Sequence, residues 1–270
     1  MDQVKNIIAV ASGKGGVGKS TTSVNLALAL QKTGARVGLL DADIYGPSQP
    51  MMLGIDNGVR PDQVGQHFIA PIIAHGLQTM SIGYLVTDDT AMAWRGPMAA
   101  SALQQLLTQT SWDDLDYLVV DLPPGTGDIQ LTLSQKVPVT GAVIVTTPQD
   151  IALIDGRKAI EMFSKVEVPV LGIVENMAVH ICSSCGHQEH IFGTEGGGGM
   201  AEQYGIPLLG VLPLDLSIRE NSDSGTPTVV SQPDSTIAIM YGNIAEAVVA
   251  SLGVHSASSS DIPTINISDD

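Results

Sequence analysis

Short aliphatic segments alternate with longer helical segments along most of the chain. Because the aliphatic segments lack polar alternation, they predict strands that are buried on both faces of a parallel sheet. The predicted strands are Asn6–Ser12, Arg36–Asp43, Tyr117–Pro124, Gly141–Pro148, Pro169–Met177 and Pro207–Asp215. The predicted helices are Lys19–Lys32, Met98–Thr110, Ile151–Val166 and Ser235–Leu252. This alternation predicts an α/β fold, with a doubly wound, mostly parallel sheet flanked by helices.

No internal repeat or linker divides this pattern, so residues 1–252 are expected to form one domain. The segment Pro61–Leu85 resembles a β-excursion inserted into the alternation. The run of four glycines at 196–199 is expected to be a flexible connection into a short helix. Residues 253–270 are serine-rich and acidic, which predicts a disordered tail.

The composition and net charge of the chain indicate which kinds of binding partner are unfavourable. The chain has 270 residues, is 44% hydrophobic and only 4% aromatic, and carries a formal net charge of −16. Such an acidic surface disfavours both nucleic acid and anionic membranes as partners. No segment has about 18 consecutive apolar residues, so no membrane helix is expected. The first residues lack a signal-peptide pattern and the 2 cysteines cannot form a disulfide framework, so a cytoplasmic location is expected.

The segment "GKGGVGKS" matches the phosphate-binding P-loop pattern, and it lies between a predicted strand and a predicted helix. Glycines allow backbone N–H groups to surround phosphate oxygens, and the helix N-terminus adds partial positive charge. Lys19 is expected to reach the β- and γ-phosphates of ATP, and Ser20 to ligate Mg²⁺. The candidate ATP-binding residues of the loop are Gly13, Lys14, Gly15, Gly16, Val17, Gly18, Lys19, Ser20 and Thr21.

Aspartates end two of the predicted strands, at the sheet edge where open α/β sheets bind ligands. Asp121 is expected to hold Mg²⁺ through a water molecule. Asp41 and Asp43 form a pair that can position or deprotonate an attacking water, which makes Asp43 a candidate catalytic residue. The alternative for each aspartate is a structural role as a helix cap.

Lys14 is an additional lysine inside the loop itself. It cannot easily fold back onto the phosphates that its own loop surrounds. It can instead reach a nucleotide held by a second subunit and supply positive charge in trans, as an arginine finger does. Lys14 and Lys19 are therefore the candidate catalytic cations.

Cys182 and Cys185 form a C-x-x-C pair with His180, His187 and His190 nearby. Two thiolates and two of these histidines would complete a tetrahedral zinc site within one chain. An iron–sulfur cluster prefers four thiolates, which two chains related by a two-fold axis would supply together. Inert thiols are the third interpretation.

The motifs together resemble a known family. "GKGGVGKSTTSVNLALAL" followed by "VGLLDADIYGPS" is similar to the deviant P-loop class of dimeric ATPases, which includes MinD and ParA. "DADIYGPSQP", "WRGPM", "DLPPGTGD" and "ENM" followed by C-x-x-C and "IFG" are similar to the Mrp/ApbC family of ATP-dependent iron–sulfur cluster carriers. The resemblance extends from about Asn6 to Leu252. Many bacterial members carry a small additional domain before the P-loop, whereas about a dozen residues precede it here.

This resemblance implies a homodimer that binds ATP and Mg²⁺ and holds one [4Fe–4S] cluster between its subunits through Cys182 and Cys185. It further implies slow ATP hydrolysis, a scaffold protein as cluster donor and apo iron–sulfur proteins as recipients. Lys14 is similar to the signature lysine, and Asp43 and Asp121 lie at the two nucleotide-sensing switches. Asn176 matches the asparagine that recognises adenine. The C-x-x-C segment, residues 176–193, is expected to be an insertion in the ATPase domain.

Three other functions remain as alternatives. A zinc-stabilised, MinD-like switch or adaptor would use the same P-loop with a structural C-x-x-C. A membrane-cycling MinD would need a basic amphipathic C-terminal helix, and a ParA-like DNA partitioner would need a basic face. The acidic composition disfavours both of the last two.

Overall fold

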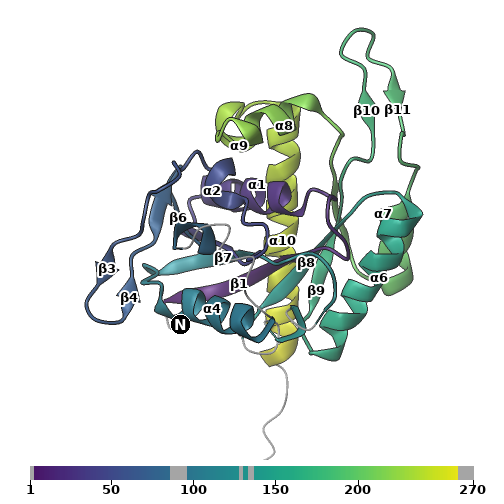
Figure 1. The fold of residues 1–270 in the computed structure, drawn as a ribbon. Helices are drawn as coiled ribbons and strands as arrows, with labels where there is room; N and C mark the ends of the chain where they lie inside the picture. Colours follow the sequence, from purple (N-terminus) through teal and green to yellow (C-terminus); the bar gives the residue numbers. More distant parts are fainter. Residues whose placement is uncertain (1–2, 86–95, 128–129, 133–136, 261–270) are drawn as a thin grey trace, which may run out of the picture.

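The computed structural model describes residues 3–85, 96–127, 130–132 and 137–260. Its central sheet has the strand order β12-β9-β8-β1-β7-β2-β6-β5, and the strands that pair within it are parallel except for β5 against β6 (Figure 1). The α/β prediction is confirmed. The sheet strands are β1 (Val4–Ala11), β2 (Val37–Asp41), β5 (Ile72–Ala74), β6 (Leu77–Ser81), β7 (Leu115–Asp121), β8 (Gly141–Thr146), β9 (Val170–Glu175) and β12 (Leu208–Val211).

Helices cover both faces of the sheet (Figure 1). One core lies beneath α4 (Gly96–Gln109), α6 (Asp150–Lys165) and α7 (Gly196–Tyr204). The other lies beneath α1 (Lys19–Lys32), α9 (Thr228–Ser231) and α10 (Thr236–Ser260). Shorter elements complete the described chain: α2 (Gln49–Met52), η1 (Ile82–Tyr84), α8 (Leu216–Asp223), and the strand pairs β3 (Gln63–Val64) with β4 (Phe68–Ile69) and β10 (His180–Ile181) with β11 (Gln188–Glu189).

The segment Pro61–Leu85 is β-structure, as predicted, but part of it belongs to the main sheet. β6 pairs in parallel with β2, and β5 folds back along β6 as the antiparallel edge. β5 is the edge strand of the sheet, and its Ile73 is 63% exposed.

The last helix is longer than predicted, because α10 continues past Leu252 to Ser260. The predicted disordered tail is therefore wrong for residues 253–260, and residues 261–270 lie outside the described part of the chain. Within α10, Thr236–His255 is long and apolar enough to cross a membrane by length and composition. Tyr241, Ile244 and Val248 of this stretch are at most 1% exposed and belong to the core. The body of the protein buries 39% of its most apolar window.

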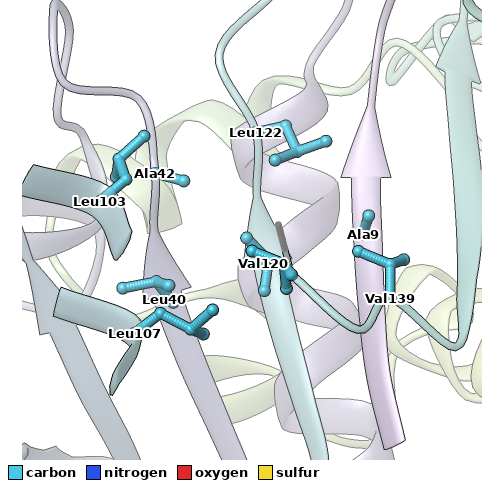
Figure 2. Close-up of a pocket in the computed structure, with 9 residues that line it drawn as sticks. Ala9, Leu40, Ala42, Leu103, Leu107, Val120, Leu122 and Val139 are labelled. Carbon is cyan, nitrogen blue, oxygen red and sulfur yellow. The ribbon is translucent and has the colours of Figure 1, made fainter. Parts of the chain in front are cut away.

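A small cavity lies between α4 and the sheet (Figure 2). Its volume is about 10 Å³, room for about one water molecule, and its lining is aliphatic throughout. The lining residues are Ala9, Leu40, Ala42, Leu103, Leu107, Val120, Leu122, Val137 and Val139. These side chains cannot form hydrogen bonds with a nucleotide. The polar residues predicted to bind ATP lie in other parts of the structure.

Candidate nucleotide site and cysteine hairpin

The P-loop connects β1 to α1 at the edge where the parallel strands end. Gly16 and Gly18 have φ angles of +82° and +84°, in the left-handed region that favours glycine. Gly18 caps the first turn of α1. The strand–loop–helix context predicted from the sequence is therefore present, and it presents a helix N-terminus to an anion.

Three other segments hold the loop in place. Gly125, in the turn after β7, donates its N–H to the Ser12 carbonyl at 2.9 Å. Asn176, directly after β9, donates its side-chain Nδ2 to the Val17 carbonyl at 2.9 Å. On the third side, a Cβ atom on Gly13 would lie 2.0 Å from the backbone carbon of Asp155 in α6. The loop is thus part of the packed body of the protein.

Lys19 is buried in a cluster of polar groups, with only 6% of its surface exposed. Its Nζ atom lies 2.6 Å from Asp121 Oδ1, 3.1 Å from Ser20 Oγ and 3.9 Å from Asp43 Oδ2. The lysine predicted to hold phosphate is therefore paired with the carboxylate that ends β7. A nucleotide phosphate must compete with this ion pair.

Protein donors surround the Asp121 carboxylate, which is fully buried. Besides Lys19, Ser23 Oγ donates to Oδ1 at 2.8 Å, and Gln49 Nε2 donates to Oδ2 at 2.9 Å. Neither donor was predicted from the sequence. Ser23 follows Lys19 by one helical turn, a spacing that could have indicated it. No local pattern indicates Gln49, which comes from a different element.

Asp41 has a structural role. Its carboxylate accepts hydrogen bonds from the backbone N–H groups of Ser48 and Gln49, each at 3.1 Å, and so caps the start of α2. It also accepts from the Asp43 N–H and from Ser81 Oγ. Burial, with the neighbouring Asp121 carboxylate as the next cause, raises the pKa of Asp41 to about 7. Its four donors support the capping alternative.

The side chains of Asp43 and Lys14 are partly exposed to solvent. The Asp43 side chain is 14% exposed, and burial is the main reason that its pKa is raised above the ordinary carboxyl value. Lys14 is partly exposed, and the structure gives it no ion pair among the residues described. Its side chain does not join the cluster around Lys19.

The C-x-x-C pair lies on a hairpin, formed by β10 and β11, that projects from the body of the protein (Figure 1). The turn is closed by hydrogen bonds from the Cys182 N–H to the His187 carbonyl and from the Gly186 N–H to the Cys182 carbonyl. Cys182 is partly buried, Cys185 is exposed, and both thiols are free. Hydrogen bonds from the backbone N–H of Ser184, then from that of Cys185, lower the pKa of the Cys182 thiol. A thiolate is the form that binds metal.

The histidines near this pair do not complete a metal site in one chain. A ring nitrogen of His180 hydrogen-bonds the Leu214 carbonyl at 3.2 Å, and one of His190 bonds the Ala178 carbonyl at 2.8 Å. Among the described residues, which include both cysteines and all three histidines, no three His, Cys, Asp or Glu side chains are close enough to hold a metal. The single-chain zinc site considered from the sequence is therefore not formed.

Comparison with known proteins identifies the family. The family model for ParA, described as "NUBPL iron-transfer P-loop NTPase", matches residues 3–249. This chain belongs to that family. The sequence resemblance to iron–sulfur carriers of the deviant P-loop class is thereby confirmed.

Two relatives illustrate how far the match extends. The iron-sulfur cluster carrier protein of Escherichia coli K12 is 67% identical over 92% of this chain and 67% of its own length. The iron-sulfur cluster transfer protein NUBPL of mouse is 52% identical over 93% of this chain and 79% of its own length.

The solved structures agree with this assignment. A nucleotide-binding protein from Archaeoglobus fulgidus, in complex with ADP, is 38% identical, with a TM-score of 0.76, over 88% of this chain and 92% of that one. The cell division ATPase MinD of Pyrococcus furiosus is 25% identical, with a TM-score of 0.70, over 91% of this chain and 98% of that one.

Proposed function

We propose that the chain is a homodimeric ATPase that carries a [4Fe–4S] cluster between its two subunits and transfers it to apo iron–sulfur proteins. The observation that carries the proposal is the position of Cys182 and Cys185, which offer two thiol ligands on a projecting turn. A cluster needs about four thiolates. Two copies of the hairpin facing each other supply them. The names of the relatives, which are carriers and transfer proteins of iron–sulfur clusters, support the same function.

ATP is the proposed ligand of the P-loop, with residues 13–21 around its phosphates and Asn176 at its base. Lys19 exchanges the Asp121 carboxylate for phosphate, and Asp43 positions the attacking water. Lys14 acts on the nucleotide of the partner subunit. Ser20 and Asp121, the latter through water, would hold Mg²⁺, which neutralises phosphate charge when bound. Ser20 Oγ and the Asp121 carboxylate are oxygen ligands of the kind that a hard cation prefers, and Lys19 Nζ, which contacts both, would have to leave them for the phosphates.

The nucleotide site and the hairpin are connected through the end of β9. Asn176 touches the P-loop and precedes Cys182 by six residues. Between them, the Ala178 N–H donates to the Leu212 carbonyl at 3.0 Å, and the Leu214 N–H donates to the Val179 carbonyl at 2.8 Å. These bonds anchor the base of the hairpin to the segment after β12. A change at the P-loop on ATP binding or hydrolysis therefore has a short route to the cysteines.

The proposed cluster site works only in a reducing environment. Its four cysteines must stay reduced to bind a cluster, which requires a reducing compartment such as the cytoplasm. Donor scaffold and recipient proteins would meet the cluster where the hairpins project.

Anaerobic reconstitution tests the proposal. Wild-type protein, a Cys182→Ser/Cys185→Ser variant and a Ser183→Ala control are incubated with iron and sulfide, and their iron, acid-labile sulfide and zinc are quantified. We expect about four iron and four sulfide per two chains in the wild type and the control, and background in the double variant, with ADP binding unchanged in all three. Zinc in place of iron and sulfide would favour the adaptor function. Retention of the cluster without both cysteines would refute the ligand assignment.

A further inference from the structure

Gln49, the first residue of α2, connects three parts of the candidate site and is only 1% exposed. Its side-chain Nε2 donates to the Ser20 carbonyl at 3.0 Å and to Asp121 Oδ2 at 2.9 Å. Its backbone N–H donates to Asp41 Oδ2 at 3.1 Å. One residue therefore bridges two buried carboxylates and the P-loop serine.

The orientation of the Gln49 amide follows from these contacts. Both hydrogens of its NH₂ group are used, one on each acceptor. Rotating the amide by half a turn would place its oxygen against the Ser20 carbonyl and the Asp121 carboxylate, which repel it. The nitrogen must therefore face Ser20 and Asp121.

The amide oxygen of Gln49 is left without a donor. Oε1 is buried and has no hydrogen-bond partner among the residues that the structure describes. Ser48 Oγ, on the preceding residue, is also buried without a hydrogen-bond partner among the described residues. A buried acceptor without a donor is costly, and it indicates a partner that the protein itself does not supply.

We propose that Gln49 is a positioning residue for Mg²⁺, and that its Oε1 accepts a hydrogen bond from a water molecule bound to the metal at Ser20. The inference rests on the nucleotide site of the proposed function. Mg²⁺ keeps several of its waters in protein sites, and a metal-bound water is a strong hydrogen-bond donor. Ser20 offers the metal a hydroxyl, and the contact between Gln49 and the Ser20 carbonyl keeps the amide beside it.

This arrangement links the metal to the segment after β2. Gln49 begins α2, which Asp41 caps, and the chain between them carries Asp43. A metal-bound water held by Gln49 would therefore fix α2 and the Asp43 segment in one position relative to the P-loop.

The test compares ADP binding with and without the metal. Calorimetric titrations of ADP in Mg²⁺ and in EDTA give the factor by which Mg²⁺ strengthens binding. The variants are Gln49→Met, which keeps the volume and removes the amide, and Gln49→Asn, which keeps an amide but draws its oxygen back by one methylene group. Gln105→Met, on the exposed face of α4, is the matched control.

We expect Gln49→Met to lower the Mg²⁺ factor about tenfold, the scale of one hydrogen bond to a charged group, while the control keeps the wild-type factor. Gln49→Asn should also lower the factor, because its shorter side chain withdraws the acceptor oxygen from the metal-bound water. A purely structural glutamine would weaken ADP binding equally in Mg²⁺ and in EDTA, and that result would overturn the proposal. If Gln49→Met melts below the assay temperature, Gln49→Asn decides alone, since a wild-type Mg²⁺ factor in a folded Gln49→Asn protein contradicts the acceptor role of Oε1. Wild-type protein that binds no ADP would instead refute the nucleotide site, and this inference with it.

Discussion

The P-loop edge of the sheet and the cysteine hairpin differ in how much of a site one chain contains. At the P-loop, Lys19 and Asp121 are buried and bonded to each other and to neighbouring elements. At the hairpin, Cys185 is exposed, and the turn provides two thiols where a cluster needs about four. The nucleotide site is therefore largely assembled before any ligand binds, whereas the proposed cluster site requires a second chain.

This difference predicts how each region responds to substitution. Changes at the P-loop edge should alter the stability of the single chain, because its functional groups are also packing and hydrogen-bonding groups. Changes at the hairpin should alter only what the proposed dimer binds.

Lys19→Met should have the largest effect on stability. The substitution removes the cation that is 2.6 Å from a fully buried carboxylate, and leaves Asp121 without a countercharge. Breaking a buried pair in this way costs about 3 kcal/mol. Urea unfolding without nucleotide measures the loss.

Lys14→Met is the matched control for this prediction, because Lys14 lies in the same loop but is partly exposed. We expect its free energy of unfolding to stay within about 0.5 kcal/mol of the wild type, while the proposed ATP hydrolysis by the proposed dimer is lost. If Lys19→Met and Lys14→Met destabilise the protein equally, the buried Lys19 contributes no more to stability than the partly exposed Lys14, which would contradict this account.

The sequence predicted those parts of the site that depend on local pattern. The P-loop, the carboxylate that ends β7 and the parallel strands all follow from residue order and aliphatic runs. It did not predict that Lys19 pairs with Asp121 or that Gln49 bridges the buried carboxylates. Those contacts depend on how β2, β7 and α1 meet at one edge, which no short stretch of sequence encodes.

Gly13→Ala should have the next largest effect. Its new methyl group would overlap the backbone of Asp155, which cannot move without displacing α6. Overpacking of this kind costs about 2 kcal/mol, so unfolding in urea should shift accordingly and ADP binding should weaken.

Gly15→Ala provides the comparison in the same loop. The nearest atom to its Cβ would be Pro124 Cγ at 3.9 Å, an ordinary contact. We expect a change below about 0.5 kcal/mol in the unfolding free energy. Similar losses in the two variants would mean that α6 does not support the loop as described.

Asp41 should give the P-loop edge a pH dependence. Its pKa rises from an ordinary 3.8 to about 7, so the folded protein holds a proton that the unfolded chain releases. Its contribution to stability is therefore present at low pH and is lost as the pH rises toward 7, by up to about 1.4 kcal/mol per pH unit.

Asp41→Asn, which cannot titrate, isolates this contribution. We expect the difference in unfolding free energy, wild type minus variant, to fall between pH 5 and pH 7 and to level off at pH 8. A difference that is constant across this range would show that Asp41 is already ionised at pH 5.

Gly198→Ala should have the smallest effect, and it should be stabilising. Gly198 lies inside α7, and a Cβ there would meet no atom within 4 Å. Alanine in a helix interior is more stable than glycine by about 0.8 kcal/mol, which corresponds to a rise in Tm of about 2 °C. A fall in Tm would show that this part of α7 must bend.

The four glycines also show why one prediction from the sequence was wrong. They form the first turns of α7 and not a flexible connection before it. At Gly197, a Cβ would lie 2.6 Å from the Glu175 carboxylate, which accepts the Gly197 N–H. At Gly196, it would meet Leu153 at 2.6 Å. Close approach to β9 and α6 requires glycine there, and this tertiary requirement overrides helix propensity.

Native mass spectrometry of anaerobically reconstituted protein tests the central claim most directly. The account predicts a species with the mass of two chains and one [4Fe–4S] cluster, absent from the Cys182→Ser/Cys185→Ser variant. A single chain that carries one zinc ion through the same two cysteines would contradict it.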